Sequence, residues 1–415
     1  MSRSAGKILM LVENHFPQDT RVKNEASLLT EAGYQVSVIA LRRKGQTGRE
    51  TLNSVEVYRL PTLEVFKKTP SANVTRMDLL FVKLKSFLGY VVEYCYFTAA
   101  CLIVSTYIFV RRGFDVMHAH NPPDTLFLVA LPFKLLGKKF VFDQHDLCPE
   151  LYRSRYNAKE GFYSRLLRMF EWCSLKLADI TIATNESYKQ IQINRANKSP
   201  HDVFVVRNGP NQMRMTPVAP NTRLKKMNKF ILCYIGSLNP QDGVDYLLRS
   251  LRHLLYDLKC SNFHCVIIGT GDSLQDLRDL AGNLQLNGCV ELLGFVSDED
   301  LQANLAAADI CVDPDPSSPL NDVSTWIKVM EYMAYAKPIV AFDLKETRFS
   351  AGDAAVYVRP NKEAEFAEAI TQLMAQPELR KKMGTFGRRR VEHELQWNTV
   401  GKNLLTAYET LLAEK

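Results

Sequence analysis

Short apolar runs alternate along the chain with longer segments of helical period. Residues 7–12 (KILMLV) read as a buried strand, residues 19–32 as a helix capped by Asp19, and QVSVIA and VEVYRL as further strands. The same alternation resumes at residues 230–236 (FILCYIG) and continues towards the C-terminus. Strands that alternate with helices are typical of parallel sheets. The pattern therefore predicts an α/β fold throughout.

The length and composition favour two domains. The chain has 415 residues, of which 46% are hydrophobic, which is enough for two cores. A polar, basic run that ends at Lys226 separates the two series of strands. The formal charge is 52 − 45 = +7, which suits a phosphate-bearing substrate or an anionic membrane surface and is too small to indicate nucleic acid.

Nine cysteines are scattered along the chain without a Cys-x-x-Cys pair. Several lie in apolar runs, which favours reduced thiols in a cytoplasmic protein over disulfides or zinc sites. The N-terminus lacks the shape of a cleavable signal peptide. Residues 87–110 are apolar with Glu93 as their one charge, and this length suffices to span a membrane. A span would place two halves of one domain on opposite sides, so we expect a long helix on the N-terminal domain. Contact with the bilayer interface and burial without lipid contact both remain open.

Residues 313–352 contain a second apolar segment with a few polar exceptions. We predict a helix that begins near Ser324 and ends before Pro338, apolar nearly all round and therefore buried. Ser324, Lys328 and Glu331 are spaced i, i+4 and i+7 and would share one stripe. Because a buried charge needs a partner or a ligand, the stripe faces a cleft, or Lys328 and Glu331 form a structural pair. The residues alone do not decide between the two.

Histidines follow three of the predicted strands. His15 comes after the first strand, His118 and His120 share one face of the strand at 115–120, and His145 follows the strand at 139–144. Ligands of open α/β sheets bind at these carboxyl ends. No third zinc ligand stands at a typical spacing from the His118/His120 pair, so we predict no metal site.

A family resemblance adds to these patterns. EYMAYAKP, from Glu331 to Pro338, resembles the donor site of retaining family 4 glycosyltransferases with the GT-B fold. HAHNPPD and HDLCPELY resemble the bacterial polysaccharide-type branch of the same family. The resemblance implies two Rossmann-like domains that face a central cleft. It implies an acceptor-binding domain at residues 1–215, a nucleotide-sugar-binding domain at 216–397, and a C-terminal helix at 398–415 that packs back onto the first.

The resemblance also implies roles for single residues. Glu331 would hold the ribose of the donor, and Lys328 with Ser324 and Thr325 would hold its diphosphate. His145 would face the transferred sugar, which makes His145, Lys328 and Glu331 the expected catalytic residues. The remaining expected donor contacts are Gly236, Ser237, Phe295 and Val296, and the expected acceptor contacts are His15, His120 and Asn121.

The chain departs from the family pattern at three positions. Val323 stands where a second glutamate is usual, and Ser237 and Asp242 stand where an arginine and a lysine usually clamp the diphosphate. Loss of two cations removes stabilisation of the leaving group. A non-catalytic sugar-nucleotide-binding partner of another transferase is therefore the main alternative, and a GT-B sugar-nucleotide epimerase is a second.

The expected activity is that of a hexosyltransferase-type enzyme in polysaccharide or glycoconjugate biosynthesis. It would move a sugar from a UDP- or GDP-linked donor to a glycan or lipid-linked glycan, with retention, without a metal and without a cofactor. We expect it in the cytoplasm and expect no nucleic-acid partner, while peripheral contact of residues 87–110 with the cytoplasmic face of a membrane remains open.

Overall fold

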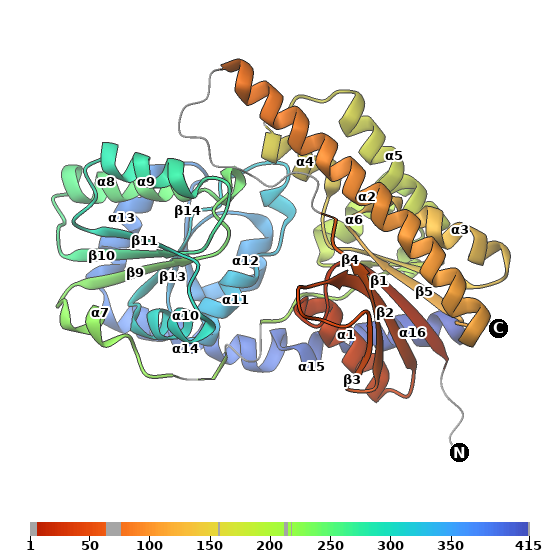
Figure 1. Cartoon of the computed structure of the whole chain (residues 1–415). Coiled ribbons are helices and arrows are strands. Elements are labelled where there is room, and N and C mark those ends of the chain that lie inside the picture. Colours follow the sequence, from red (N-terminus) through yellow and green to blue (C-terminus); the bar gives the residue numbers. More distant parts are fainter. Residues whose placement is uncertain (1–5, 64–75, 157, 211–214, 217, 414–415) are drawn as a thin grey trace. The chain divides into compact units, whose positions relative to one another are not determined.

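The computed structural model describes residues 6–63, 76–156, 158–210, 215–216 and 218–413, and the side chains of residues 76–88 and 90 are outside this description. The chain divides into two compact units (Figure 1). Unit 1 comprises Met1–Val206 and Gly401–Lys415, and unit 2 comprises Arg207–Val400. The first boundary thus lies after Val206 rather than after residue 215, and the chain returns to unit 1 at Gly401 rather than at residue 398.

Unit 1 contains an eight-stranded sheet in the order β3-β4-β2-β1-β5-β6-β7-β8. All neighbours are parallel except β3 and β4, which are antiparallel. The strands are β1 (Lys7–His15), β2 (Gln35–Arg42), β3 (Arg49–Leu52), β4 (Val55–Pro61), β5 (Val116–His120), β6 (Lys139–Gln144), β7 (Ile180–Ala183) and β8 (Val203–Val205). The expected parallel α/β fold is confirmed for this unit.

Helices surround this sheet. They are α1 (Thr20–Glu31), α2 (Arg76–Arg112), α3 (Phe127–Leu135), α4 (Cys148–Tyr156), α5 (Phe162–Leu177), α6 (Glu186–Ala196) and α16 (Lys402–Ala413). The predicted cap of α1 is confirmed, because a carboxylate oxygen of Asp19 accepts a hydrogen bond from the Val22 amide at 3.1 Å. The C-terminal α16 belongs to unit 1, where the buried Tyr408 hydroxyl lies 3.0 Å from Nδ1 of His118.

Unit 2 contains a six-stranded parallel sheet in the order β11-β10-β9-β12-β13-β14. The strands are β9 (Phe230–Ile235), β10 (Phe263–Ile268), β11 (Val290–Gly294), β12 (Ile310–Asp313), β13 (Ile339–Phe342) and β14 (Ala355–Val358). The helices are α7 (Thr222–Lys226), α8 (Val244–Arg252), α9 (Leu274–Asn283), α10 (Asp298–Ala307), α11 (Ile327–Ala334), α12 (Lys345–Ala351), α13 (Glu363–Met374), α14 (Pro377–Arg390) and α15 (Trp397–Val400).

Each strand of unit 2 feeds two hydrophobic clusters, one on each face of the sheet. In β9, Leu232 and Tyr234 pack into one cluster, while Ile231 and Cys233 pack into the other. Because successive side chains of a strand point to opposite faces, a central strand covered on both sides is apolar at every position. This explains why the run at 230–235 shows no polar alternation.

Strand register in unit 1 gathers polar side chains at one edge of its sheet. Val12 of β1 pairs with His120 of β5, and His120 pairs in turn with Asp143 of β6. The three strands run parallel, so their carboxyl ends lie at the same edge. His145 follows one residue after β6 ends at Gln144, at this edge.

Candidate active site

A buried ion pair lies in unit 1 at the end of the sheet where the parallel strands have their carboxyl ends. Arg21 of α1 donates from Nε and Nη2 to the two carboxylate oxygens of Asp143, both at 2.9 Å. Its Nη1 donates to the backbone carbonyl of Val206 at 2.8 Å, and its Nε lies 3.1 Å from Oε1 of Glu25. A bidentate arginine fixes a carboxylate in orientation as well as in charge. Asp143 is therefore held rigidly inside the unit.

His145 contacts the Arg21–Asp143 pair and is partly exposed to solvent. Its Nε2 lies 3.0 Å from Oδ2 of Asp143 and 3.2 Å from Nδ1 of His120, and its side chain is 18% exposed. Oδ1 of Asn121 accepts hydrogen bonds from the backbone amides of His145 at 2.5 Å and Asp146 at 3.1 Å. Asp143 and His120 thus position the His145 ring, and Asn121 positions its backbone.

The charges in this network are distributed unevenly. Burial raises the pKa of Asp143, but Arg21 and His145 outweigh burial, and the pKa of Asp143 lies well below its usual range. Burial, together with the neighbouring Asp143, raises the pKa of Glu25 well above its usual range. Burial lowers the pKa of His120. The network therefore favours one ionised carboxylate, one protonated carboxyl and a neutral His120.

Four buried side chains of this network carry potential metal ligands. One ligand atom each from Glu25, His118, His120 and Asp143 lies within 4.8 Å of the other three. The sequence spacing showed no third metal ligand for the His118/His120 pair, but the fold brings two carboxylates to it, Glu25 of α1 and Asp143 of β6. However, Arg21 already contacts both carboxylates, so a divalent ion would lie beside a guanidinium in a buried site. The arrangement fits a hydrogen-bonded network better than a metal centre.

The three residues expected to contact an acceptor have different positions. His15 ends β1 and is half-buried, with Nδ1 at 3.2 Å from the Leu41 carbonyl oxygen. His120 and Asn121 are buried, and their hydrogen bonds go to protein groups around His145. In this structure both side chains therefore contact protein groups around His145, and their expected contact with an acceptor stays a prediction.

In unit 2, Lys328 is buried between two aspartates. Its Nζ lies 3.1 Å from Oδ1 of Asp313 and 2.5 Å from Oδ2 of Asp315, and 4.9 Å from the centre of the Tyr234 ring. Burial lowers the pKa of Lys328, but Asp315, Tyr234, Asp313 and Asp242 outweigh burial, and its pKa lies well above its usual range. Lys328 is therefore firmly charged.

The helix that carries Lys328 is shorter than we expected. It begins at Ile327, not near Ser324, and ends at Ala334. The Ser324 amide closes the preceding turn on the Asn321 carbonyl oxygen, and its hydroxyl donates to the Leu320 carbonyl oxygen at 2.7 Å. Ser324 and Thr325 thus precede the helix, and the proposed three-residue stripe reduces to Lys328 and Glu331. The predicted burial of the helix is confirmed, since every residue from Lys328 to Ala334 is buried.

The other expected donor contacts follow two strand ends. The Gly236 amide donates to the Ile268 carbonyl oxygen at 3.0 Å, so the sheet uses the hydrogen that we assigned to a phosphate. Glycine is needed there because φ is 153° and a Cβ atom would lie 2.8 Å from the Tyr234 hydroxyl. Ser237 is exposed, Val296 is half-buried and Phe295 is 85% exposed.

Two family profiles match most of the chain. The profile described as Glycosyltransferase Family 4 matches residues 18–212, and the profile described as Glycosyl transferases group 1 matches residues 229–376. The first match includes His120, Asn121 and His145, and the second includes Lys328 and Glu331. The chain belongs to the family 4 glycosyltransferases. It is thus a glycosyltransferase with the GT-B fold and acts in glycan biosynthesis.

Related sequences and structures agree with this assignment. The MMP alpha-(1->4)-mannosyltransferase of Mycolicibacterium hassiacum is 24% identical, and the match covers 95% of each chain. The alpha-D-kanosaminyltransferase of Streptomyces kanamyceticus is 28% identical over 155 residues, which are 37% of this chain and 38% of that enzyme.

Among solved structures, the sucrose-phosphate synthase of Thermosynechococcus elongatus superposes with a TM-score of 0.75 at 16% identity, covering 99% of this chain and 100% of that one. HepE of Anabaena, solved with UDP-glucose, superposes with a TM-score of 0.68 at 16% identity, covering 98% and 100%. At such identities the superpositions show the GT-B fold alone.

This glycosyltransferase has a carboxylate where its family usually has a clamping lysine. Asp242 accepts a hydrogen bond from the Asn239 amide at 2.8 Å and is among the groups that raise the pKa of Lys328. Three carboxylates, Asp242, Asp313 and Asp315, thus act on one ammonium. The positive charge that Lys328 can offer a ligand therefore depends on how many of these three carboxyl groups are ionised.

The sequence analysis did not select Arg21, Glu25 or Asp143. Two local signals were present: Arg21 and Glu25 are four residues apart on one helix face, and Asp143 lies two residues before His145, near the end of the strand. The pairing itself joins residues 122 positions apart, which no local pattern reveals.

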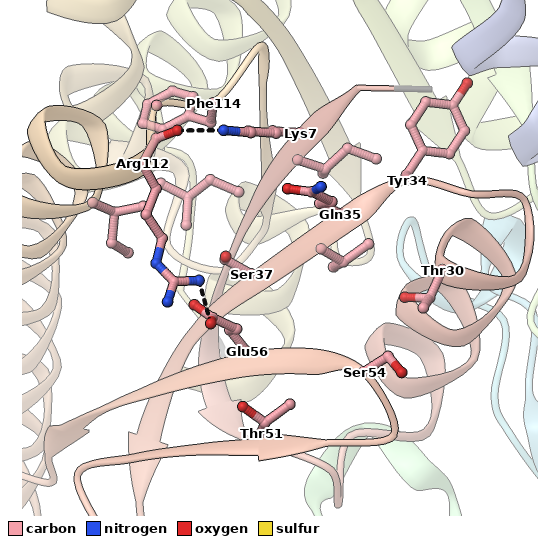
Figure 2. A pocket seen from close by; sticks show the side chains of 15 residues that line it. Lys7, Thr30, Tyr34, Gln35, Ser37, Thr51, Ser54, Glu56, Arg112 and Phe114 are labelled. Carbon is pink, nitrogen blue, oxygen red and sulfur yellow. Dashed lines mark hydrogen bonds and ion pairs between the residues drawn. The ribbon is translucent and has the colours of Figure 1, made fainter. Parts of the chain in front are cut away.

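Unit 1 also contains a pocket of about 320 Å³ at the opposite, amino ends of β1 and β2 (Figure 2). Lys7 donates from Nζ to the Arg112 carbonyl oxygen at 2.6 Å, and the Arg112 guanidinium pairs with Glu56. Figure 2 shows both interactions spanning the pocket wall. None of the histidines described above lines it, so it is separate from the candidate active site.

Proposed function

We propose that this glycosyltransferase moves a hexosyl group from a UDP- or GDP-linked donor to a glycan or lipid-linked glycan, with retention of anomeric configuration. The observation that carries the proposal is His145, a partly exposed histidine that a buried Arg21–Asp143 pair holds at the carboxyl edge of the unit 1 sheet. The UDP-glucose in the related HepE structure supports a nucleoside-diphosphate sugar as donor.

In this reaction the bond between the anomeric carbon and the diphosphate oxygen breaks, and a bond to the acceptor oxygen forms on the same face. The acceptor hydroxyl gives its proton to the leaving diphosphate, so the protein needs no covalent nucleophile. Its contribution is then positioning and charge stabilisation. His145 would hydrogen-bond the substrate beside the reacting carbon. No step of this scheme requires a metal or an organic cofactor.

Unit 2 would bind the donor. Glu331, on the same helix as Lys328, would accept hydrogen bonds from the ribose, and the exposed Phe295 ring would stack on the base. Lys328 would supply the positive charge for the diphosphate. Burial and Asp313 raise the pKa of Asp315 well above its usual range, which favours its protonated form. Protonation of Asp315 would leave Lys328 more of its charge for the donor.

Two measurements test this function. In a thermal-shift screen of UDP- and GDP-sugars, the true donor should raise the melting temperature of the protein, because a ligand that binds the native state stabilises it. Nucleoside diphosphate release with that donor should then fall strongly in His145→Ala. Binding without transfer or hydrolysis, unchanged by His145→Ala or Lys328→Ala, would instead support the non-catalytic binding partner.

We further propose that the acceptor is presented at a membrane surface. Among the described residues, Val91–Arg112 is the one helical stretch long and apolar enough to cross a membrane, by length and composition only, and 22% of its apolar window is buried. Helices α2 and α3 pack together, as do α3 and α5 (Figure 1). We refer to the exposed apolar residues of these three helices together as the apolar face: Val91, Val92, Leu102, Ile103, Tyr107, Val110, Leu128, Leu131, Leu135, Phe162, Tyr163, Met169 and Trp172.

Basic residues accompany the apolar face. Arg111 and Arg112 end α2, and Lys134 lies in the last turn of α3. Apolar side chains beside cations suit the interface of a bilayer with anionic headgroups. This placement would keep the enzyme in the cytoplasm, at the cytoplasmic face of the membrane.

Vesicle co-sedimentation tests the apolar face. We expect binding to vesicles that contain phosphatidylglycerol, weaker binding to phosphatidylcholine alone, and loss of binding in Ile103→Glu/Val110→Glu. Leu258→Glu, on an exposed leucine of unit 2, is the matched control and should bind as the wild type does. Wild-type protein that remains in the supernatant and prefers water-soluble acceptors would contradict the membrane proposal and leave the sugar transfer intact.

A further inference from the structure

The hydrogen-bonding groups around Nε2 of His145 determine which ring nitrogen carries the proton. Oδ2 of Asp143 lies 3.0 Å from Nε2, and a carboxylate oxygen only accepts. Nε of Arg21 also lies 3.0 Å from Nε2, but it only donates, and it has a carboxylate partner at 2.9 Å in Asp143. A lone pair at Nε2 would face a negative oxygen. Nδ1 of His120 lies 3.2 Å from Nε2 and 3.3 Å from Oδ2 of Asp143, so a neutral His120 can accept from Nε2 or donate to the same carboxylate. A proton at Nε2, donated to Asp143, therefore agrees with all three neighbours.

Besides His145, side chains of α1 and β5 face Asp143. On α1 these are Arg21 and Glu25, and on β5 they are His118 and His120. Arg21 binds both oxygens of Asp143, which keeps this carboxylate ionised, while the buried Glu25 favours its protonated form. Asp143 is thus the charged acceptor in a network whose other carboxyl is neutral.

We propose that Asp143 is a positioning residue, which holds His145 as the Nε2–H tautomer and leaves Nδ1 to accept a hydrogen bond from a substrate hydroxyl. Arg21 supports this role by keeping the carboxylate charged and oriented. The inference deepens the proposed function, on which its catalytic meaning rests. The tautomer itself is a property of the unliganded protein. The logic is that of an aspartate behind a histidine in hydrolases, where an amide in place of the carboxylate presents the wrong tautomer.

Asp143→Asn tests the assignment with little change in volume. Arg21 requires an oxygen acceptor, so the amide oxygen should face Arg21 and the amide NH₂ should face His145. That donor would favour a lone pair at Nε2 and move the proton to Nδ1. We expect kcat to fall about 10²–10⁴-fold, with the KM for the donor changed by less than about threefold.

Long-range ¹H–¹⁵N correlation spectra of the histidine side chains give the decisive readout, with His145→Ala used to assign the His145 signals. In its neutral form the His145 ring of the wild type should show protonated Nε2 and unprotonated Nδ1, and Asp143→Asn should reverse them. Protonated Nδ1 in the wild type would overturn the proposal. So would an unchanged tautomer and unchanged kcat in Asp143→Asn.

Two further measurements keep the test decisive. Arg21→Lys retains the charge but loses the bidentate geometry, so it should keep the tautomer and lower kcat by about tenfold. Arg21→Lys replaces Asp143→Asn as the test variant if Asp143→Asn does not fold. Stoichiometric zinc in the purified protein would also overturn the proposal, because Asp143 and His120 would then be metal ligands. A reversed tautomer in Asp143→Asn without any sugar transfer by the wild type would refute the proposed function and leave the positioning role standing.

Discussion

Each unit buries one cation between two acidic side chains, at the end of its sheet where the parallel strands have their carboxyl ends. In unit 1 Arg21 binds Asp143 and Glu25, and in unit 2 Lys328 binds Asp313 and Asp315. The Arg21 guanidinium donates its hydrogen bonds to protein groups. Its partner Asp143 in turn contacts the partly exposed His145. The Lys328 ammonium has three donors, and its ion pairs among the described residues are with Asp313 and Asp315. We interpret Arg21 as a structural cation, whereas Lys328 is the cation that we propose for the donor diphosphate.

The comparison predicts the largest effect for Arg21. Arg21→Met leaves the buried Asp143 carboxylate without its partner, so we expect a loss of about 3–5 kcal/mol in the free energy of unfolding. Urea denaturation measures it. The double variant Arg21→Met/Asp143→Asn removes the stranded charge and should recover part of the loss. A loss below about 1 kcal/mol in the single variant would show that the pair is not structural.

A neutral carboxyl next to the unit 1 network predicts a pH-dependent effect. Burial and Glu171 raise the pKa of Asp124 to about 7, and Asn121 donates to one of its oxygens. Folding therefore takes up a proton between the unfolded pKa of about 3.9 and about 7, and the stability from this group falls as pH rises through that window.

Asp124→Asn imitates the protonated form at every pH. Its stability relative to the wild type should rise by roughly 1.4 kcal/mol for each pH unit between about 5 and 7 and then level off. Thermal or urea unfolding of both proteins at several pH values provides the measurement. A stability difference that is independent of pH would mean that Asp124 is ionised in the folded protein.

Replacement of Lys328 tests the second cation. Lys328→Met should weaken donor binding about 10–100-fold, because charge-assisted hydrogen bonds contribute about 1.5–3 kcal/mol. Calorimetric titration with the donor found by screening measures the affinity. Lys337→Met is the control, since Lys337 donates to the Ala306 and Ala308 carbonyl oxygens and has no proposed donor contact. Equal affinity in Lys328→Met and the wild type would remove Lys328 from the donor site.

The smallest expected effect concerns Phe295. Phe295→Ala should reduce donor affinity about tenfold through loss of stacking on the base, which is worth about 1–3 kcal/mol. Folding stability should be unchanged, because the ring is exposed. Phe349→Ala, another exposed phenylalanine of unit 2, serves as the control. A matching affinity loss in both variants would point to a general effect on the unit.

Local periodicity in the sequence predicted the helices and strands. It did not predict contacts between residues that are far apart in the chain. Strand and helix periodicity predicted both parallel sheets and the buried helix around Met330. The start of that helix was wrong by three residues, because Ser324 closes the preceding turn. The Gly236 amide was assigned to a phosphate, but it completes the sheet with Ile268, a strand partner that only the fold identifies.

The candidate site shows the same division. The positions of His145 and Lys328 followed from strand ends and the family resemblance, whereas Arg21 and Asp143 came together only in three dimensions. His120 was expected to contact an acceptor, but it is fully buried, because strand alternation predicts the face on which a side chain lies and not how deeply it is buried. Burial depth depends on which helix covers that face, here α1 with Arg21 and Glu25.

The division of labour between the two units is tested most directly by measuring donor affinity and turnover together in His145→Gln. We predict that the dissociation constant of the sugar nucleotide stays within about twofold of the wild type, while kcat for sugar transfer falls about 100-fold or more. Donor affinity lost together with an unchanged single-turnover rate would contradict the account, because His145 would then bind the donor rather than act at the reacting centre.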